Sequence, residues 1–280
     1  MLRSFLSDVR HGARRGWRRT TRRWTDPEVS EQEILDALHR LSPAKPGPLM
    51  VHSSLSACGL VRGGPLAIIQ ALRSWSAGGM LVMPAHSYCY PTASSVAPVF
   101  DRPSTRGVVG TIAEVFRKQP GVLRSLHPTH SLAVEGVDGP SVITGHETCI
   151  TPCGPDTPYA RLVKADAAVL MFGVTLDAYT FFHTAEDAAA VPYLYERQPV
   201  SLRFRDSNGV EHSMMMRKHD MGVARSFAAK RSWLEERGLL SRIALGAGEL
   251  LLLPHAQQVH NAVVDELRRD PWFLTTRRAA

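Results

Sequence analysis

The stretch AVLMFGV, residues 168–174, is the clearest sign of a buried strand in this chain. A short apolar run that ends in a glycine-containing turn is typical of a strand covered on both faces. Similar runs stand at residues 49–52 and 80–84, and each precedes a segment with apolar residues at helical spacing. This alternation of strands and helices predicts an α/β core with helices on both faces of the sheet.

Segments on either side extend this core. Ser30–Glu33 is a capping-box pattern that predicts the start of a helix. Residues 200–205 and 210–216 alternate in polarity around DSNG at 206–209, which predicts an added antiparallel β-hairpin. A last helix is expected over residues 255–268. Because no low-complexity linker divides these elements, we expect one compact folded unit.

The net charge of the chain is concentrated at its N-terminal end. Residues 1–24 hold eight arginines and one aspartate, so they carry +7, which equals the net charge of the whole chain. We therefore divide the chain into a basic tail at 1–24 and a single domain at 25–280. The near-neutral domain offers no basic face, so no nucleic-acid partner is expected. For the tail, weak contact with an anionic membrane surface and a loosely docked extension both stay open.

The apolar and cysteine patterns bear on where the protein works. No apolar run approaches the ~20 residues of a transmembrane helix, and no apolar segment of a secretory signal follows the arginines. The four cysteines are then expected to be free thiols in a reducing, cytoplasmic compartment. A homodimer is compatible with the sequence.

Three polar segments carry the candidate chemistry. The first is His52-Ser53-Ser54, followed by a loop with Gly63 and Gly64. Small hydroxyl residues and glycines between a strand and a helix can hydrogen-bond a phosphate, although they also occur in turns for conformational reasons alone. The segment matches neither the P-loop nor the dinucleotide pattern, which argues against nucleotide hydrolysis and hydride transfer.

The second and third segments supply imidazole and carboxylate groups. His127 and His130 flank Pro128, so they are expected on a bend rather than inside a helix. His183 and Glu186 follow the strand at 168–174, at a position typical of an active-site loop. Glu186 could accept a hydrogen bond from His130 and orient it as a base. Structural histidines and a solvated His183–Glu186 pair are the alternative interpretations.

The same residues allow other classes of protein. Three histidines and a carboxylate could bind zinc in a metal-dependent hydrolase, although Pro128 disturbs the spacing and no H-E-x-x-H pattern is present. Cys58 could carry an acyl group, but no motif pairs it with a base. A non-enzymatic module that binds through the arginine-rich tail is the third class.

Four segments together resemble one known family, the aminoglycoside 3-N-acetyltransferases. The similarity runs from about residue 31 through the C-terminal helix. The segments are MVHSSLSACGLVRGGP (50–65), SLHPTHSLAVEG (125–136), CGPDTPYARL (153–162) and VLMFGVTLDAYTFFHTAE (169–186).

The resemblance implies a three-layer α/β/α fold with a mixed central sheet. It also implies a CoA-dependent N-acyltransferase that uses acetyl-CoA as co-substrate, transfers the acyl group directly to an amine and requires no metal. In the family's HPTHS motif the second histidine falls on His130, and the acid falls on Glu186. The resemblance therefore makes His130 the general base and Glu186 its orienting partner.

The resemblance also implies where the two substrates bind. Ser53, Ser54, Gly63 and Gly64 would lie along the pantetheine-phosphate arm of CoA. Val109 stands where the family commonly has a methionine, so some contacts to CoA or the acceptor differ here.

The acceptor is the less specified partner. Aminoglycosides are polycations, so a dedicated site should present several carboxylates. Asp101, Asp177, Glu186 and Asp187 are the candidates, with His183 as a further contact, and no acidic insertion is present. An aminoglycoside, a related amino sugar and a biosynthetic sugar or natural-product amine all stay open.

Overall fold

The central sheet of the computed structural model is mixed, as expected. The structure describes residues 28–42 and 47–276, so the predicted tail at 1–24 lies outside the described residues. In the described part, seven strands pair in the order β11-β12-β8-β2-β4-β7-β6. They are β2 (Leu49–Ser53), β4 (Leu81–Pro84), β6 (Leu123–Arg124), β7 (Leu132–Glu135), β8 (Ala168–Phe172), β11 (Ser241–Leu245) and β12 (Gly248–Leu253). The central strands β8, β2 and β4 are parallel, and the outer strands are antiparallel to their neighbours.

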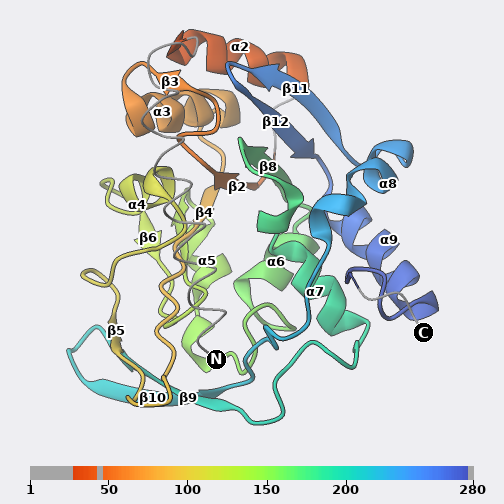
Figure 1. Ribbon diagram of the computed structural model, residues 1–280. Helices are drawn as coiled ribbons and strands as arrows, with labels where there is room; N and C mark the ends of the chain where they lie inside the picture. The colour runs from red at the N-terminus through yellow and green to blue at the C-terminus, as the bar shows by residue number, and fades with distance from the viewer. Residues whose placement is uncertain (1–27, 43–46, 277–280) are drawn as a thin grey trace.

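Helices cover both faces of this sheet (Figure 1). The first layer contains α2 (Glu31–Leu41), α3 (Gly64–Ser76) and α4 (Thr111–Phe116). The second contains α5 (Gly139–Ile143), α6 (Pro158–Lys164), α7 (Phe181–Ala188) and α9 (Ala256–Arg269). The short helix α8 (Arg231–Glu236) precedes β11. The predicted three-layer α/β/α fold is confirmed.

Strand β8 explains why the layers form on both sides. Successive side chains of a strand point to opposite faces. Val169 and Met171 pack with the second layer, whereas Leu170 and Phe172 pack with the first. All four side chains are fully buried, so the apolar run that predicted this strand supplies the core on both faces.

The predicted hairpin is present but is separate from the central sheet. Strands β9 (Val200–Arg205) and β10 (Glu211–Met216) pair antiparallel, and β9 also pairs parallel with β5 (Val99–Asp101). This three-stranded sheet lies at the end of the molecule opposite α2 and α3 (Figure 1). A two-residue pairing of β1 (Glu28–Val29) with β3 (Leu60–Val61) completes the strands of the described residues.

Local signals at the helix ends match the sequence expectations. Ser30 caps α2 in a capping box with Glu33, and α9 lies within a residue of its expected bounds. Among the described helices, none has the length and apolar character needed to cross a bilayer.

Candidate active site

A pocket of about 310 Å³ opens where the parallel strands end. Ser53 is the last residue of β2, Pro84 is the last of β4, and Val174 follows β8 closely. The carboxyl ends of parallel strands meet at one edge of a sheet, where α/β enzymes commonly bind ligands. The described residues that line the pocket are His52, Ser53, Pro84, His86, Tyr88, Val109, His130, Val174, Asp177, Ala178, Tyr179, Thr180, His183 and Phe227.

A carboxylate–imidazole pair stands at this pocket on helix α7. Phe182 and Ala185 anchor the helix in the core, and this orientation buries Glu186 completely. The carboxylate of Glu186 accepts a hydrogen bond from Nδ1 of His183 at 2.5 Å. With Nδ1 engaged, Nε2 is the ring nitrogen of His183 left to exchange a proton with a ligand.

Glu186 has a second polar partner, Arg225, on the segment between β10 and α8. Nε of Arg225 lies 3.5 Å from its other carboxylate oxygen. A fully buried carboxylate needs such partners to stay charged. The carboxylate of Glu186 can therefore offset a positive charge on the His183 ring without help from water.

His130 also lines the pocket, but its partner differs from the expected one. Its Nδ1 lies 2.8 Å from the hydroxyl of Thr129, whereas Glu186 bonds His183 and Arg225. The expected hydrogen bond from His130 to Glu186 is therefore wrong. Burial, with the neighbouring histidines as a smaller cause, holds the pKa of His130 well below its ordinary value.

A histidine that the sequence analysis missed lies between the two. The ring centroid of His219 is 4.3 Å from that of His183 and 5.9 Å from that of His130. His219 stands just after the hairpin strand β10, in no recognisable motif, so only the folded chain brings it here. His130 and Glu186 are thus on the same side of the molecule, linked through His219 and His183.

His127 has a structural position. Its Nδ1 accepts hydrogen bonds from the backbone N–H groups of Thr129 and His130, at 3.3 and 3.0 Å. Its ring stacks on His146 with centroids 4.3 Å apart. The HPTHS segment is therefore a tight turn held by its own first histidine.

The predicted CoA-contacting residues divide into two groups. Ser53 lines the pocket, and its hydroxyl has no hydrogen-bond partner among the described residues. Nε2 of the neighbouring His52 is equally buried and unpartnered in this part of the chain. Gly63 and Gly64 do not line the pocket, and Ser54 does not either. Both glycines have positive φ angles, of 80° and 62°, so the turn into α3 is sufficient reason for them.

The candidate acceptor-binding acids also divide. Asp177 lines the pocket and accepts a hydrogen bond from the backbone N–H of Ala228 at 2.9 Å. Asp101 accepts from the hydroxyl of Ser104, and Asp187 from the hydroxyl of Tyr195. Neither Asp101 nor Asp187 lines the pocket.

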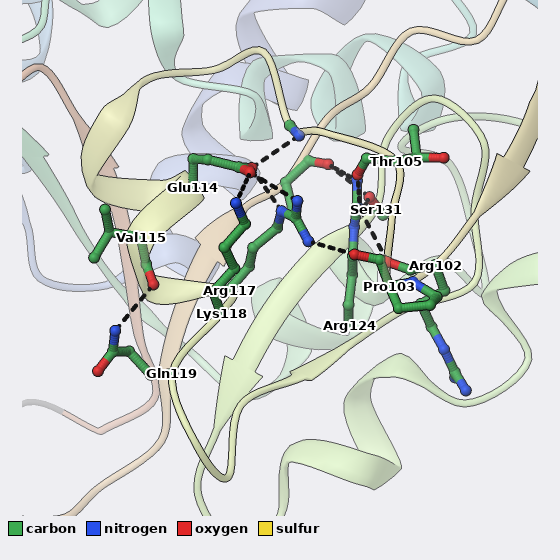
Figure 2. Close-up of polar contacts among 12 residues, drawn as sticks. Arg102, Pro103, Thr105, Glu114, Val115, Arg117, Lys118, Gln119, Arg124 and Ser131 are labelled. Carbon is green, nitrogen blue, oxygen red and sulfur yellow. Dashed lines mark hydrogen bonds and ion pairs between the residues drawn. The ribbon is translucent and has the colours of Figure 1, made fainter.

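Two arginines hold the loop at residues 102–105 (Figure 2), which precedes Val109 of the pocket lining. The guanidinium of Arg124 donates to the carbonyl oxygens of Arg102 and Thr105 and to the hydroxyl of Ser131. Arg117 pairs with Glu114 at 2.6 Å and donates to the carbonyl of Pro103. These guanidinium groups satisfy the backbone carbonyl oxygens of the loop. The loop is therefore held in place before a ligand binds.

The structure does not support the two other chemistries considered from the sequence, a metal site and an acyl group carried on Cys58. Across residues 28–42 and 47–276, no three His, Cys, Asp or Glu side chains gather as metal ligands. Cys58 is fully buried away from the pocket lining, and burial raises the pKa of its thiol to about 11. A protonated thiol of this kind is a poor nucleophile.

An imidazole–carboxylate pair beside a pocket at the strand ends of an α/β/α fold is an arrangement that acyl-transfer enzymes use. A family model described as "Aminoglycoside 3-N-acetyltransferase" matches residues 50–265. The chain therefore belongs to the aminoglycoside 3-N-acetyltransferase family.

Individual relatives agree with this assignment. The chain is 30% identical to aminoglycoside N(3)-acetyltransferase IV of Salmonella sp over 250 residues, 87% of this chain and 89% of the relative. It is 32% identical over 222 residues to aminoglycoside N(3)-acetyltransferase VIII of Streptomyces fradiae, covering 67% of this chain and 76% of the relative.

Solved structures share the fold. The apoenzyme of the aminoglycoside acetyltransferase AAC(3)-IVa superposes with a TM-score of 0.76 at 27% identity, covering 90% of this chain and 93% of that one. AAC-IIIb, solved as a binary complex with CoASH, has a TM-score of 0.76 at 25% identity and covers 90% of this chain and 100% of its own.

Proposed function

We propose that this protein transfers the acetyl group of acetyl-CoA to an amine of an aminoglycoside or a related amino sugar. The observation that carries the proposal is the buried Glu186–His183 pair beside the pocket, in a chain of this family. The AAC-IIIb complex with CoASH supports a CoA thioester as donor. A mutant of AAC(3)-IVa in complex with a gentamicin supports an aminoglycoside or a compound like it as acceptor.

His183, rather than His130, is the proposed general base. An ammonium is not nucleophilic, so the acceptor amine must lose a proton before or during attack on the thioester carbonyl. The ammonium first releases one proton to solvent. As the neutral amine then attacks, Nε2 of His183 takes a second proton from its nitrogen, and the carboxylate of Glu186 supports the imidazolium from the Nδ1 side. His130 has only the neutral hydroxyl of Thr129 at its Nδ1, so nothing there offsets a positive charge.

The rest of the reaction follows from the same residues. The amine nitrogen forms a bond to the carbonyl carbon, and the carbonyl oxygen becomes an oxyanion. Ser53 Oγ and His52 Nε2, both buried and without a partner among the described residues, are the proposed donors to that oxygen. The tetrahedral intermediate then expels the CoA thiolate, which recovers the proton from His183. Acetyl-CoA and the amine become CoA thiol and an amide, and no covalent enzyme intermediate is required.

The setting agrees with a cytoplasmic enzyme, which is part of the proposal. All four cysteines are buried free thiols, without a disulfide among the described residues. Cysteines persist in this state in reducing compartments. A biosynthetic sugar or natural-product amine is the alternative acceptor, since Asp177 is the only acid that lines the described pocket.

The test is the release of CoA thiol from acetyl-CoA by the purified protein. Release is expected only when an amine is added, and the amide product should appear in equal amount. An acceptor panel should contain aminoglycosides with and without a free 3-amine, together with simple amino sugars. Steady thiol release without any amine would instead indicate a thioester hydrolase and would overturn the proposal.

A further inference from the structure

We infer that the pocket takes an amine borne on a single ring, with little charge beyond that amine, and that the ring rests on Tyr88. We expect the pocket to bind an acceptor with several positive charges less well than one with a single amine. The inference rests on the proposed acyl transfer and narrows its acceptor.

The first argument is the charge of the pocket lining. Among the described residues, Asp177 is the one acid of this lining, and neither Lys nor Arg belongs to it. Burial lowers the pKa of His52 and of His86 to about 3, so both rings are uncharged near neutral pH. The segment at residues 85–100, which contributes His86 and Tyr88 to the lining, contains no Asp or Glu.

The other carboxylates near the site have other partners. Glu186 is 0% exposed and is paired with His183 and Arg225. Asp101 and Asp187 are outside the lining and hydrogen-bond their own neighbours. Several ammonium groups that enter a pocket lined by one carboxylate would lose water without each gaining a counter-charge, which is costly. One ammonium can meet Asp177, lose one proton to solvent and give a second proton to His183 as the amine attacks.

The second argument is an aromatic side chain on the pocket wall. Tyr88 lines the pocket, and 47% of its surface stays exposed. Its ring is stacked with Tyr90, with centroids 6.3 Å apart and planes 11° from parallel. An exposed aromatic face in a pocket binds the apolar face of a sugar ring or an adjacent cation.

Tyr88 is also held in place by a chain of hydrogen bonds. Its hydroxyl is 3.1 Å from Nδ1 of His86, and Nε2 of His86 is 2.5 Å from the hydroxyl of Tyr159. Tyr159 in turn donates to the backbone carbonyl of His130 at 3.3 Å. One set of protons satisfies every group: Tyr88 donates to His86, His86 to Tyr159, and Tyr159 to the carbonyl. The chain links the aromatic wall to the HPTHS turn, so the ring is positioned before a ligand binds.

The backbone at Tyr88 supports a functional reason for this residue. Its φ angle is +48°, in the left-handed region that a bulky side chain rarely adopts. Five non-glycine residues of the described chain have a positive φ, and Tyr88 is the one aromatic residue among them. Strain of this kind clusters at functional sites. Glycine would relieve it but would remove the ring.

The third argument is size. A volume of about 310 Å³ is at the low end of the ~300–1,000 Å³ typical of ligand sites. The pocket must also admit the thioester end of the donor, which leaves room for about one ring of the acceptor.

The experiment compares acceptors and variants with acetyl-CoA. We expect glucosamine, which has one amine, to have a kcat/KM at least about tenfold above that of gentamicin. The KM for glucosamine should change less than about twofold between low and high salt, because a single partly buried pair is weakly screened. A preference for gentamicin, with a KM that rises steeply with salt, would overturn the inference and leave the proposed acyl transfer intact.

Two variants test the role of Tyr88 separately. Tyr88→Ala should raise the KM for glucosamine about tenfold, with the KM for acetyl-CoA unchanged. Tyr88→Phe keeps the ring, so it should raise the acceptor KM by less than Tyr88→Ala does. An unchanged acceptor KM in a folded Tyr88→Ala protein would refute the role of the ring. Absence of acetyl transfer to every amine, by contrast, would overturn the proposed function itself and this inference with it.

Discussion

The HPTHS turn and helix α7 both place histidines near the pocket, but the Nδ1 atoms of these histidines bond to different groups. In the turn, Nδ1 of His127 accepts from two backbone N–H groups, and Nδ1 of His130 meets the hydroxyl of Thr129. In the helix, Nδ1 of His183 meets the buried carboxylate of Glu186. The comparison shows that the group bonded to Nδ1 distinguishes a histidine that holds a turn from one that can carry a charge.

Burial makes this distinction sharper. His130 is buried among other imidazoles, and burial keeps its pKa well below the ordinary value. A proton placed there would have no carboxylate beside it. At His183 the same proton would form an ion pair with Glu186, which is the usual arrangement in base-assisted acyl transfer.

The largest expected effect is the loss of the His183 imidazole. His183→Ala should lower kcat by ~10²–10⁴-fold, the typical contribution of a positioned base. Its affinity for CoA, measured by calorimetry, should stay within about twofold, because the variant removes proton transfer and not the donor site. Wild-type turnover in a folded His183→Ala protein would contradict the assignment of the base.

Next in size is the loss of the carboxylate charge. Glu186→Gln keeps the side-chain volume but no longer supports an imidazolium, so kcat should fall roughly 10²-fold, less than for His183→Ala. The pH profile of kcat should change as well, because the charge next to His183 is gone. If Glu186→Gln lowered the melting temperature but left kcat and its pH profile unchanged, the role of Glu186 would be structural only.

The comparison predicts a smaller effect in the turn. His130→Gln retains a hydrogen-bonding side chain at the pocket wall, and kcat should fall by less than about tenfold. Measuring both variants under the same conditions compares the two regions directly. If His130→Gln were slower than His183→Ala, the roles assigned to the turn and the helix would have to be exchanged.

The smallest effect on turnover, and a distinct effect on stability, is expected at His127, one of three neutral buried histidines. Burial lowers the pKa of His52, His86 and His127 from 6.5 to about 3 in the folded chain. Between these two values the unfolded chain binds more protons, so stability should fall as pH falls from 6.5 toward 3. Each such group contributes on the order of 1 kcal/mol per pH unit. Melting temperatures measured across this range should fall less steeply for His127→Asn, and equal slopes would count against the burial of that ring as the cause.

Much of the fold could be predicted from local patterns. The strands at β2, β4 and β8 and the helices α2 and α9 follow from apolar periodicity and the Ser30 cap. The hairpin of β9 and β10 follows from the DSNG turn. The partners of these elements were less accessible: β5 joins the hairpin across about a hundred residues of sequence, and no local signal specifies such a pairing. The Leu250–Leu253 run has the length of a strand, but its antiparallel place beside β8 depends on long-range contacts.

The sequence predicted several residues of the candidate site, but not which of their side chains hydrogen-bond to one another. His130, His183, Ser53 and Asp177 all line the pocket, as the polar segments at the strand ends suggested. Glu186 has a different hydrogen-bond partner from the expected one. His219 and Tyr88 were missed, because neither stands in a recognisable motif.

The sequence by itself determined the layers, the family motifs and the edge of the sheet where chemistry collects, since apolar spacing and strand ends are local properties of the chain. Only the tertiary structure decided which imidazole meets the carboxylate, how few charges line the pocket and which aromatic ring forms its wall. The physical reason is that a hydrogen bond depends on position to within a few tenths of an ångström. That position is set by how α7, the HPTHS turn and the loop after β4 pack against one another.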